Sequence, residues 1–321
     1  MQNYSSIQKF LHDFVFSKKI INKSLFELEK IIYLKDQDIK NQLHVFITGM
    51  PRSGTTSLLN LLYSSNEYAS LTYKNMPFIL SPNISKLFNK KNIIKKERLH
   101  RDGISFDNNS AEAFDEIFFD NNEEFIKNDL ANYAQLILLN TKKKKYLSKN
   151  NLNYKRIDLI QSILPNSIFL IPIREPLQHA NSLLSQHLHF CQLQKEDDFI
   201  RRYMNYLGHN EFGLNHKPWN DPENFKDFNN INYWLEQWYL FYEFIYKKFQ
   251  FYENCHFIIY EELNNPNYVE KILKKLYLEK NQNIDLFFFK NANKKELNID
   301  HDKNIFDKSQ LLYKNFYVKI T

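Results

Sequence analysis

A short segment of the sequence gathers groups that bind anions. Residues 49–56 read Gly-Met-Pro-Arg-Ser-Gly-Thr-Thr, directly after the apolar run at 44–48 and before leucines at helical spacing. These patterns predict a strand, a tight loop and a helix. The N–H groups in the first turn of a helix have no partner within it, and with the helix dipole they attract negative charge. Arg52 adds a guanidinium, and Gly54 lets the backbone approach a ligand closely. The candidate ligands are Arg52, Ser53, Gly54, Thr55 and Thr56.

This loop differs from the phosphate loop of nucleotide triphosphatases. The spacing of Gly49 and Gly54 fits that motif, but Thr55 stands where a triphosphatase has the lysine that reaches the β- and γ-phosphates. The cation is Arg52 instead, inside the loop. A 5′-phosphate that carries one further group, bound without metal, therefore fits better than ATP with Mg²⁺. An ordinary strand-to-helix turn is the simpler alternative, and the use of two of only five glycines here disfavours it.

A second cationic motif follows another apolar run. Arg174-Glu175-Pro176 comes directly after residues 168–173, and Ser182 lies eight residues after Arg174. An arginine can make a bidentate, charge-assisted contact with a phosphate, and the serine can add a hydroxyl donor. Pro176 suits the first position of a helix. Alone this motif is weak, but with the first loop 122 residues upstream it predicts a ligand with two anionic groups.

Together these residues resemble the sulfotransferases that use 3′-phosphoadenosine 5′-phosphosulfate (PAPS) as sulfuryl donor. Residues 51–56 resemble their 5′-phosphosulfate loop, in the form with arginine rather than lysine, and Arg174 with Ser182 resembles their 3′-phosphate motif. Lys149 resembles the family's lysine near the donor, and residues 260–263 a supporting segment. The resemblance covers residues 43–265. It implies a PAPS-dependent sulfotransferase that transfers a sulfuryl group to a hydroxyl or amine, with no metal.

Sulfuryl transfer also needs a group that takes the proton of the acceptor. Residues 96–103 concentrate titratable side chains between the two anion sites, and His100 is our candidate for the base. Glu97 and Asp102 are alternatives, and a base elsewhere stays open. Arg52 would stabilise negative charge on the leaving group. Residues that could line an acceptor pocket are Arg201, Arg202, Tyr203, His209 and Trp219.

The elements that must position these residues form an α/β pattern. Strands are expected at 44–48, 168–173 and 256–260, and helical patterns occupy 5–34, about 110–140, and the segments that begin near 177, 234 and 266. This alternation predicts a P-loop-like, three-layer fold with a mostly parallel central sheet. We expect a helical extension over 1–40 and the sulfotransferase domain over 41–321. The lysines at 142–145 read as a loop, and the Asn- and Lys-rich end as peripheral.

Composition sets limits on the function. A net charge of +6 does not call for a nucleic acid partner, and 43% hydrophobic residues permit a sizeable core. Two cysteines do not make a disulfide scaffold or a cysteine zinc site, so a cytoplasmic location is expected. No apolar run reaches the roughly 18 residues of a membrane span. The acceptor, a carbohydrate, a lipid-linked glycan or a small molecule, stays open. A P-loop kinase that uses ATP and an inactive nucleotide-binding protein are the alternative functions.

Overall fold

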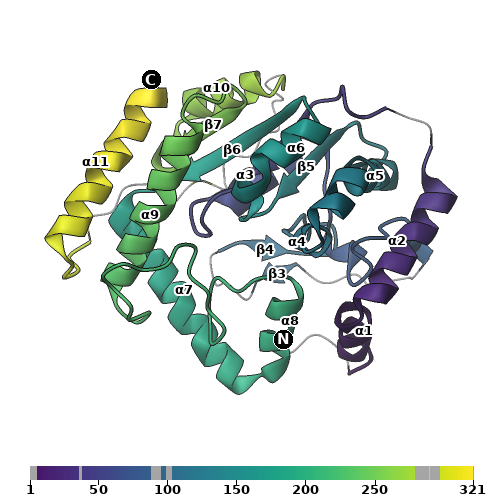
Figure 1. Cartoon of the computed structure of the whole chain (residues 1–321), viewed down its shortest axis with the longest axis horizontal. Coiled ribbons are helices and arrows are strands. Elements are labelled where there is room, and N and C mark those ends of the chain that lie inside the picture. Colours follow the sequence, from purple (N-terminus) through teal and green to yellow (C-terminus); the bar gives the residue numbers. More distant parts are fainter. Residues whose placement is uncertain are drawn as a thin grey trace.

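A five-stranded sheet with the order β2-β5-β1-β6-β7 forms the centre of the molecule (Figure 1). All of its neighbouring strands pair in parallel. The computed structural model describes residues 6–35, 38–87, 95–98, 103–278, 289 and 297–320. The strands of the sheet are β1 (His44–Ile47), β2 (Tyr68–Ala69), β5 (Lys145–Lys149), β6 (Ser167–Ile173) and β7 (Cys255–Ile259). A separate antiparallel pair consists of β3 (Lys96–Glu97) and β4 (Ser105–Phe106).

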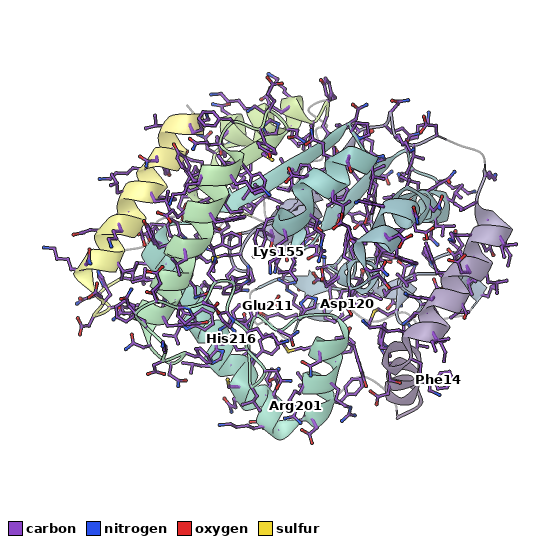
Figure 2. The ribbon with its side chains drawn as sticks, viewed as in Figure 1. Phe14, Asp120, Lys155, Arg201, Glu211 and His216 are labelled. Atoms are coloured by element: carbon purple, nitrogen blue, oxygen red, sulfur yellow. The ribbon has the colours of Figure 1, made fainter. Side chains whose placement is uncertain are left out.

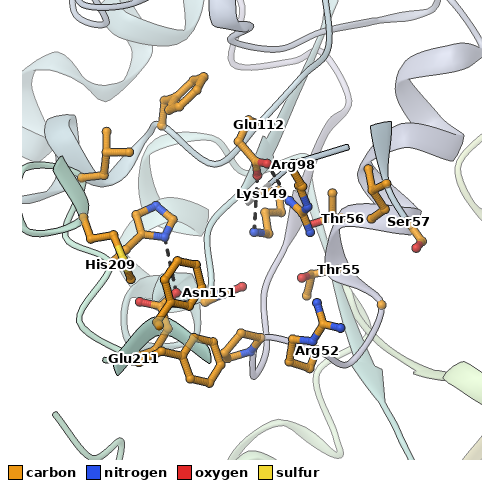
Figure 3. A pocket seen from close by; sticks show the side chains of 18 of the residues that line it. Arg52, Thr55, Thr56, Ser57, Arg98, Glu112, Lys149, Asn151, His209 and Glu211 are labelled. Atoms are coloured by element: carbon orange, nitrogen blue, oxygen red, sulfur yellow. Dashed lines mark hydrogen bonds and ion pairs between the residues drawn. The ribbon is translucent and has the colours of Figure 1, made fainter. Parts of the chain in front are cut away.

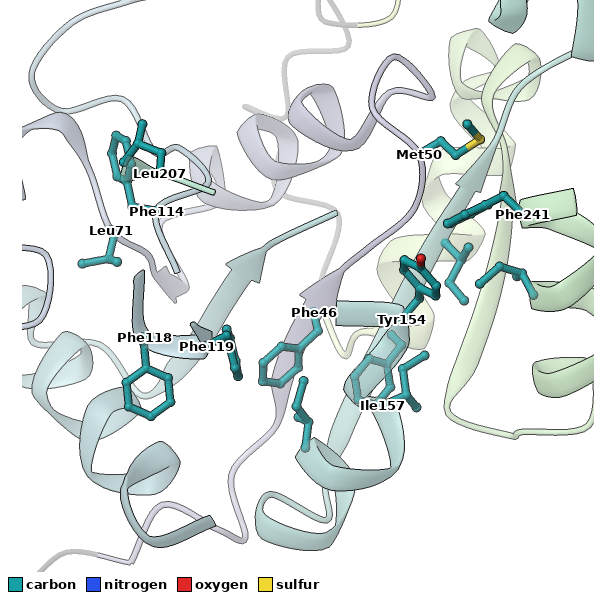
Figure 4. Close-up of a cluster of buried hydrophobic side chains, with 14 of the residues drawn as sticks. Phe46, Met50, Leu71, Phe114, Phe118, Phe119, Tyr154, Ile157, Leu207 and Phe241 are labelled. Carbon is teal, nitrogen blue, oxygen red and sulfur yellow. The ribbon is translucent and has the colours of Figure 1, made fainter. Parts of the chain in front are cut away.

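Helices cover both faces of the sheet because successive strand residues point to opposite sides. Val45 and Ile47 pack with α3 (Thr55–Ser64) and α10 (Pro266–Lys275) on one face. Phe46, between them, packs into the larger cluster on the other face (Figure 4). The helices of that second face are α5 (Glu123–Thr141), α6 (Ile157–Ile163), α7 (Pro176–Glu196), α9 (Ile231–Phe249) and α11 (Lys303–Ile320). This arrangement confirms the three-layer α/β fold.

The ladder between β1 and β6 ends where a proline interrupts it. The N–H of Thr48 donates to the carbonyl of Leu170 over 3.0 Å. The next rung would need an N–H at Pro172, which proline lacks. The chain can therefore leave the sheet after Thr48 and enter the loop. Ile47 is also in register with Lys149, the last residue of β5, so the carboxyl ends of three strands meet at one edge. Ligands of open parallel sheets bind at this edge.

The N-terminal helices pack onto the main body. Helix α1 (Ser6–Ser17) contacts α8 (Asp198–Tyr206), and α2 (Lys19–Tyr33) contacts α5. Glu29 of α2 is fully buried, and its carboxylate accepts hydrogen bonds from the N–H groups of Asn83 and Ile84 at 2.8 and 2.9 Å. The division of the chain near residue 40 stays a prediction. No helix in the described part of the chain is both long and apolar enough to span a membrane.

Three local expectations were wrong. Residues 110–115 are not helical, and the helices there are α4 (Glu116–Phe119) and α5. Lys145 begins strand β5, where its backbone pairs with Tyr68 of β2 and its ammonium lies 3.5 Å from the carboxylate of Glu67. The C-terminal segment is not simply peripheral, since α11 packs against α9 and supports the candidate site described next.

Candidate functional site

The loop between β1 and α3 has a conformation that its glycine makes possible. Arg52 has a positive φ of 70° and Gly54 one of 99°. A Cβ atom at position 54 would lie 2.5 Å from a ring carbon of Tyr260, so only glycine fits there. The hydroxyl of Ser53 donates to the carbonyl of Met50 over 2.7 Å and closes the loop on itself. Helix α3 starts directly afterwards, so its first turn faces the space beside the loop.

The second cationic motif lies against this loop. A terminal nitrogen of Arg174, which follows β6, donates to the carbonyl oxygen of Arg52 over 3.2 Å. The Nε of Arg52 in turn donates to the hydroxyl of Ser182 on α7 over 3.1 Å. The guanidinium carbon of Arg174 is 5.1 Å from the centroid of the Tyr260 ring. The two anion-binding motifs predicted from sequence therefore adjoin, and they share direct hydrogen bonds.

Carboxylates and the C-terminal helix hold the loop that carries Arg174. Glu175 caps α7 by accepting from the N–H of Gln178 at 2.8 Å, and its own N–H donates to Glu261 at 2.9 Å. From α11, Tyr313 donates to Glu261 over 2.5 Å, and Gln310 donates to Glu175. Burial raises the pKa of Glu261 despite these hydrogen bonds. Residues 260–263, which resemble a supporting segment, are thus hydrogen-bonded through Glu261 to the loop that carries Arg174.

A buried histidine on α7 is hydrogen-bonded to the loop between β1 and α3. The Nε2 of His179, on α7, lies 2.8 Å from the carbonyl oxygen of Pro51. Burial lowers the pKa of His179 to about 3, so the ring is neutral and Nε2 carries the proton that it donates. The sequence analysis assigned no role to His179. Its position three residues after the Arg-x-Pro motif, on the inner face of α7, is the signal that could have indicated this role.

Opposite Arg52, a carboxylate holds two further cations in the cavity. Glu112 accepts from Arg98 at 2.7 Å, and its other oxygen is 3.8 Å from the ammonium of Lys149. Arg98 also donates to the hydroxyl of Thr56 over 3.3 Å (Figure 3). Two cations share one carboxylate here, so this wall keeps a positive charge next to the loop. Lys149 was predicted near the donor, whereas no spacing in the sequence pointed to Glu112.

A histidine and a glutamate form an ion pair on the far side of the cavity. The Nδ1 of His209 is 3.4 Å from a carboxylate oxygen of Glu211, to which Asn151 also donates over 3.4 Å. Burial lowers the pKa of His209, but the facing carboxylate outweighs it and the pKa is raised. For Glu211, burial raises the pKa, and the charge of His209 outweighs this and lowers the pKa to about 2. Each group therefore favours the charged form of the other.

These residues surround one cavity that opens to solvent, with an empty volume of about 1100 Å³. Among the sequence candidates, those in its walls are Arg52, Gly54, Thr55, Thr56, Lys149, Arg174, Tyr203 and His209. Ser182 reaches it through its hydrogen bond to Arg52. Among the described residues no cluster of three histidine, cysteine or acidic side chains is placed to hold a metal.

Other residues that the sequence suggested for the site do not line this cavity or lie outside the described part of the chain. Glu97 is exposed on β3, where its carboxylate accepts from the N–H of Gly103 at 2.9 Å. Arg201 lies at the edge of the molecule, away from the more central Glu211 (Figure 2), and it pairs with Asp198 at 3.7 Å. Arg202 pairs with Asp13 at 3.4 Å, and Trp219 lines a neighbouring cavity. His100 and Asp102 lie outside the described residues.

Comparisons with known proteins identify the fold and the family. The fold is similar to the crystal structure of sulfotransferase STF1 from Mycobacterium tuberculosis H37Rv, with a TM-score of 0.52 and 12% identity over 97% of this chain and 86% of that one. Sulfotransferase STF9 from Mycobacterium avium gives a TM-score of 0.49 at 11% identity, over 98% of this chain and 86% of that one. No curated protein matches the sequence. A family model described as "Sulfotransferase family" matches residues 44–281, and the chain therefore belongs to the sulfotransferase family.

Proposed function

We propose that this sulfotransferase uses PAPS as its donor and transfers the sulfuryl group to a hydroxyl or amine of a small acceptor. The observation that carries the proposal is the contact between the two anion-binding motifs. Arg52 and Arg174 lie at the ends of neighbouring parallel strands and are joined by a hydrogen bond of 3.2 Å. Adenosine with a 5′-phosphosulfate and a 3′-phosphate presents two anionic groups on one ribose. Two adjoining cationic motifs suit such a ligand better than a single phosphate chain.

The residues divide the binding of the donor between them. The first turn of α3, with the hydroxyls of Thr55 and Thr56, would hold the 5′-phosphosulfate. Arg174 and Ser182 would hold the 3′-phosphate, as the resemblance implies. Arg52 belongs to the first motif and contacts both residues of the second. Its side chain donates to Ser182, and its carbonyl oxygen accepts from Arg174.

In the transfer step, the bond between sulfur and the bridging phosphate oxygen breaks as the acceptor oxygen or nitrogen bonds to sulfur. The adenosine 3′,5′-bisphosphate that leaves gains negative charge, which Arg52 and Lys149 would stabilise from the cavity wall. Protein groups fixed in advance do this without reorganising during the reaction. The acceptor gives up its proton to a base.

We retain His100 as the proposed base. Of the described titratable groups in the cavity, Glu112 is shared by two cations, and the charge of Glu211 favours the protonated form of His209, so both are poor bases. Arg98 and Ile104 stand on either side of residues 99–102 in the sequence, and both line the cavity. Glu97, whose carboxylate bonds to Gly103, is the second candidate.

A ligand-binding experiment tests the donor. Adenosine 3′,5′-bisphosphate is expected to raise the melting temperature of the protein without Mg²⁺, and labelled PAPS is expected to label a product in a metabolite extract. A larger thermal shift with ATP and Mg²⁺ would favour the P-loop kinase instead. Thr55, in place of the kinase lysine, argues against that alternative. We also propose a cytoplasmic location, which suits two cysteines that are both free thiols.

A further inference from the structure

The cavity has two walls of opposite character. One wall carries the loop between β1 and α3 together with Arg98, Lys149 and Arg174. The other wall comes from the second half of α7, from α8 and from the turn that follows α8. Its apolar residues are Phe190, Ile200, Tyr203, Met204, Leu207 and Phe212. Ser182 and Phe190 lie on the same helix, eight residues apart, which corresponds to about 12 Å along its axis. The apolar wall is thus a continuation of the donor site and not a separate cavity.

This apolar wall is held in place by its own contacts. The rings of Phe190 and Phe212 are nearly parallel, with centroids 6.4 Å apart and an angle of 10° between their planes. Gln194 accepts from the N–H of Leu214 at 2.7 Å and so fixes the turn to α7. Gly213 has a φ of 88°, which favours glycine, and a Cβ there would lie 2.4 Å from the side-chain oxygen of Gln194. The wall is therefore preformed, which favours ligand binding because little ordering is needed.

The two histidines beside this wall already contact other groups of the protein. His209 and Glu211 form an ion pair, and the second nitrogen of His209 lies 3.3 Å from the carbonyl oxygen of Ala113. His216 contacts the carbonyl oxygen of Glu211 at 2.8 Å and the hydroxyl of Tyr233 at 2.6 Å. A sugar with many hydroxyls buries many polar groups, each of which needs a partner. Groups already engaged with one another are poorly suited to supply those partners, whereas an apolar ligand needs none.

We infer that the acceptor is amphiphilic, with one hydroxyl on an apolar body, and that the six apolar residues of this wall bind that body. The inference rests on the proposed function, because the donor site fixes which end of the acceptor reacts. The hydroxyl would lie toward Lys149 and Arg98, and the apolar body along α7 and α8. Burial of the body against this wall would supply affinity by the hydrophobic effect, which grows with the apolar area buried.

A series of acceptors that share one hydroxyl tests the inference. The probes are 1-butanol, 1-hexanol, 1-octanol and 1-decanol, with methyl β-glucoside as a carbohydrate without an apolar body. Their dissociation constants are measured by calorimetry on protein saturated with adenosine 3′,5′-bisphosphate, and kcat/KM with PAPS. Affinity is expected to rise about threefold to fourfold for each methylene up to the length of the wall. Equal affinity along the series, or tighter binding of methyl β-glucoside than of 1-octanol, would overturn the inference.

Two substitutions in the apolar wall and one control substitution test whether this wall binds the alcohol. Ile200→Thr and Leu207→Asn keep approximate shape but add polar atoms, and each is expected to weaken binding of 1-decanol about threefold to thirtyfold. Leu188→Gln is the control, because Leu188 lies on α7 with an exposed side chain. The thermal shift by adenosine 3′,5′-bisphosphate reports that each variant is folded. If both wall variants bind 1-decanol as well as the control does, the assignment of this wall is wrong.

The same measurements separate this inference from the donor assignment. Binding of adenosine 3′,5′-bisphosphate together with a flat alcohol series removes the amphiphilic acceptor and leaves the donor in place. If the protein does not bind the bisphosphate, the alcohol titrations are repeated without nucleotide. A steep series then removes the donor assignment, while the apolar wall still stands as the binding site.

Discussion

The Nε of Arg52 donates to the hydroxyl of Ser182 over 3.1 Å, although the two residues are 130 positions apart in the sequence. Sequence motifs assigned Arg52 to one end of the donor and Ser182 to the other. Their hydrogen bond means that the serine also orients the guanidinium, whose planar shape makes its direction important. A substitution in one motif should therefore also alter ligand binding at the other.

Replacing Ser182 with alanine should weaken binding of adenosine 3′,5′-bisphosphate about threefold to tenfold, because one net hydrogen bond contributes about 0.5–1.5 kcal/mol. Calorimetric titration gives the dissociation constant. Ser185→Ala is the matched control, since Ser185 lies on the same helix and its hydroxyl donates to the carbonyl of Asn181 within that helix, at 2.8 Å. Equal affinities in the two variants would remove Ser182 from the donor site.

Replacing Arg174 with alanine should weaken adenosine 3′,5′-bisphosphate about tenfold to a hundredfold and adenosine 5′-monophosphate far less. The physical reason is that a charge-assisted contact to the 3′-phosphate contributes about 1.5–3 kcal/mol, and the monophosphate lacks that group. Titration of both nucleotides against both proteins checks this difference. Equal losses for the two nucleotides would mean that Arg174 does not bind the 3′-phosphate.

His100→Ala should lower kcat by about 10²–10⁴-fold and leave binding of adenosine 3′,5′-bisphosphate intact, because removal of a general base affects proton transfer and not donor affinity. Steady-state kinetics with PAPS and 1-octanol, combined with nucleotide titration, measures both quantities. Glu97→Gln serves as the comparison within the same segment. Full turnover in His100→Ala with loss of turnover in Glu97→Gln would transfer the role of base to Glu97.

The ion pair of His209 and Glu211 should make stability depend on pH in a defined window. The raised pKa of His209 stabilises the fold fully below the usual value of 6.5, and that contribution is lost as pH rises through the folded-state pKa. The pKa of Glu211 is lowered to about 2, so its carboxylate stabilises the fold fully above pH 4.5. That contribution to stability is lost as the pH falls toward 2. The pair therefore contributes most between pH 4.5 and 6.5.

Urea unfolding of the wild type and of Glu211→Gln over a range of pH tests this window. The difference in free energy of unfolding should be largest, on the order of 1–3 kcal/mol, inside the window and smaller on both sides. Glu243→Gln is a suitable control, because Glu243 also has a lowered pKa but its principal partner is the hydroxyl of Tyr239, which stays neutral in this range. A difference that does not vary with pH would contradict the ion pair.

The sequence predicted the two anion motifs because each combines a local pattern with a fixed place in a parallel sheet. Once the runs before Gly49 and Arg174 are strands of one sheet, their carboxyl ends must share an edge. Local patterns also predicted helices close to α5, α7 and α9 of the second face, but not α11. The positions of these two motifs therefore needed no knowledge of long-range contacts.

Most of the parts that the sequence analysis missed arise from contacts between segments that are distant in the sequence. Glu112 matters because it pairs with Lys149 at the end of β5. Glu211 is an exception, because it lies two positions from His209 and a local turn brings the two side chains together. His179 braces Pro51 across 128 positions. Such pairs leave no periodic signal in the sequence. The base at His100 stays a prediction.

The ring of Tyr260 has a consequence for donor selection. It fills the space between the backbone of Gly54 and the guanidinium of Arg174, so a single aromatic side chain acts as a spacer between the two cationic motifs. Under the proposed function, the 5′-phosphosulfate and the 3′-phosphate would bind on either side of this ring. A nucleotide whose second phosphate extends the 5′ chain would then miss Arg174 and bind more weakly.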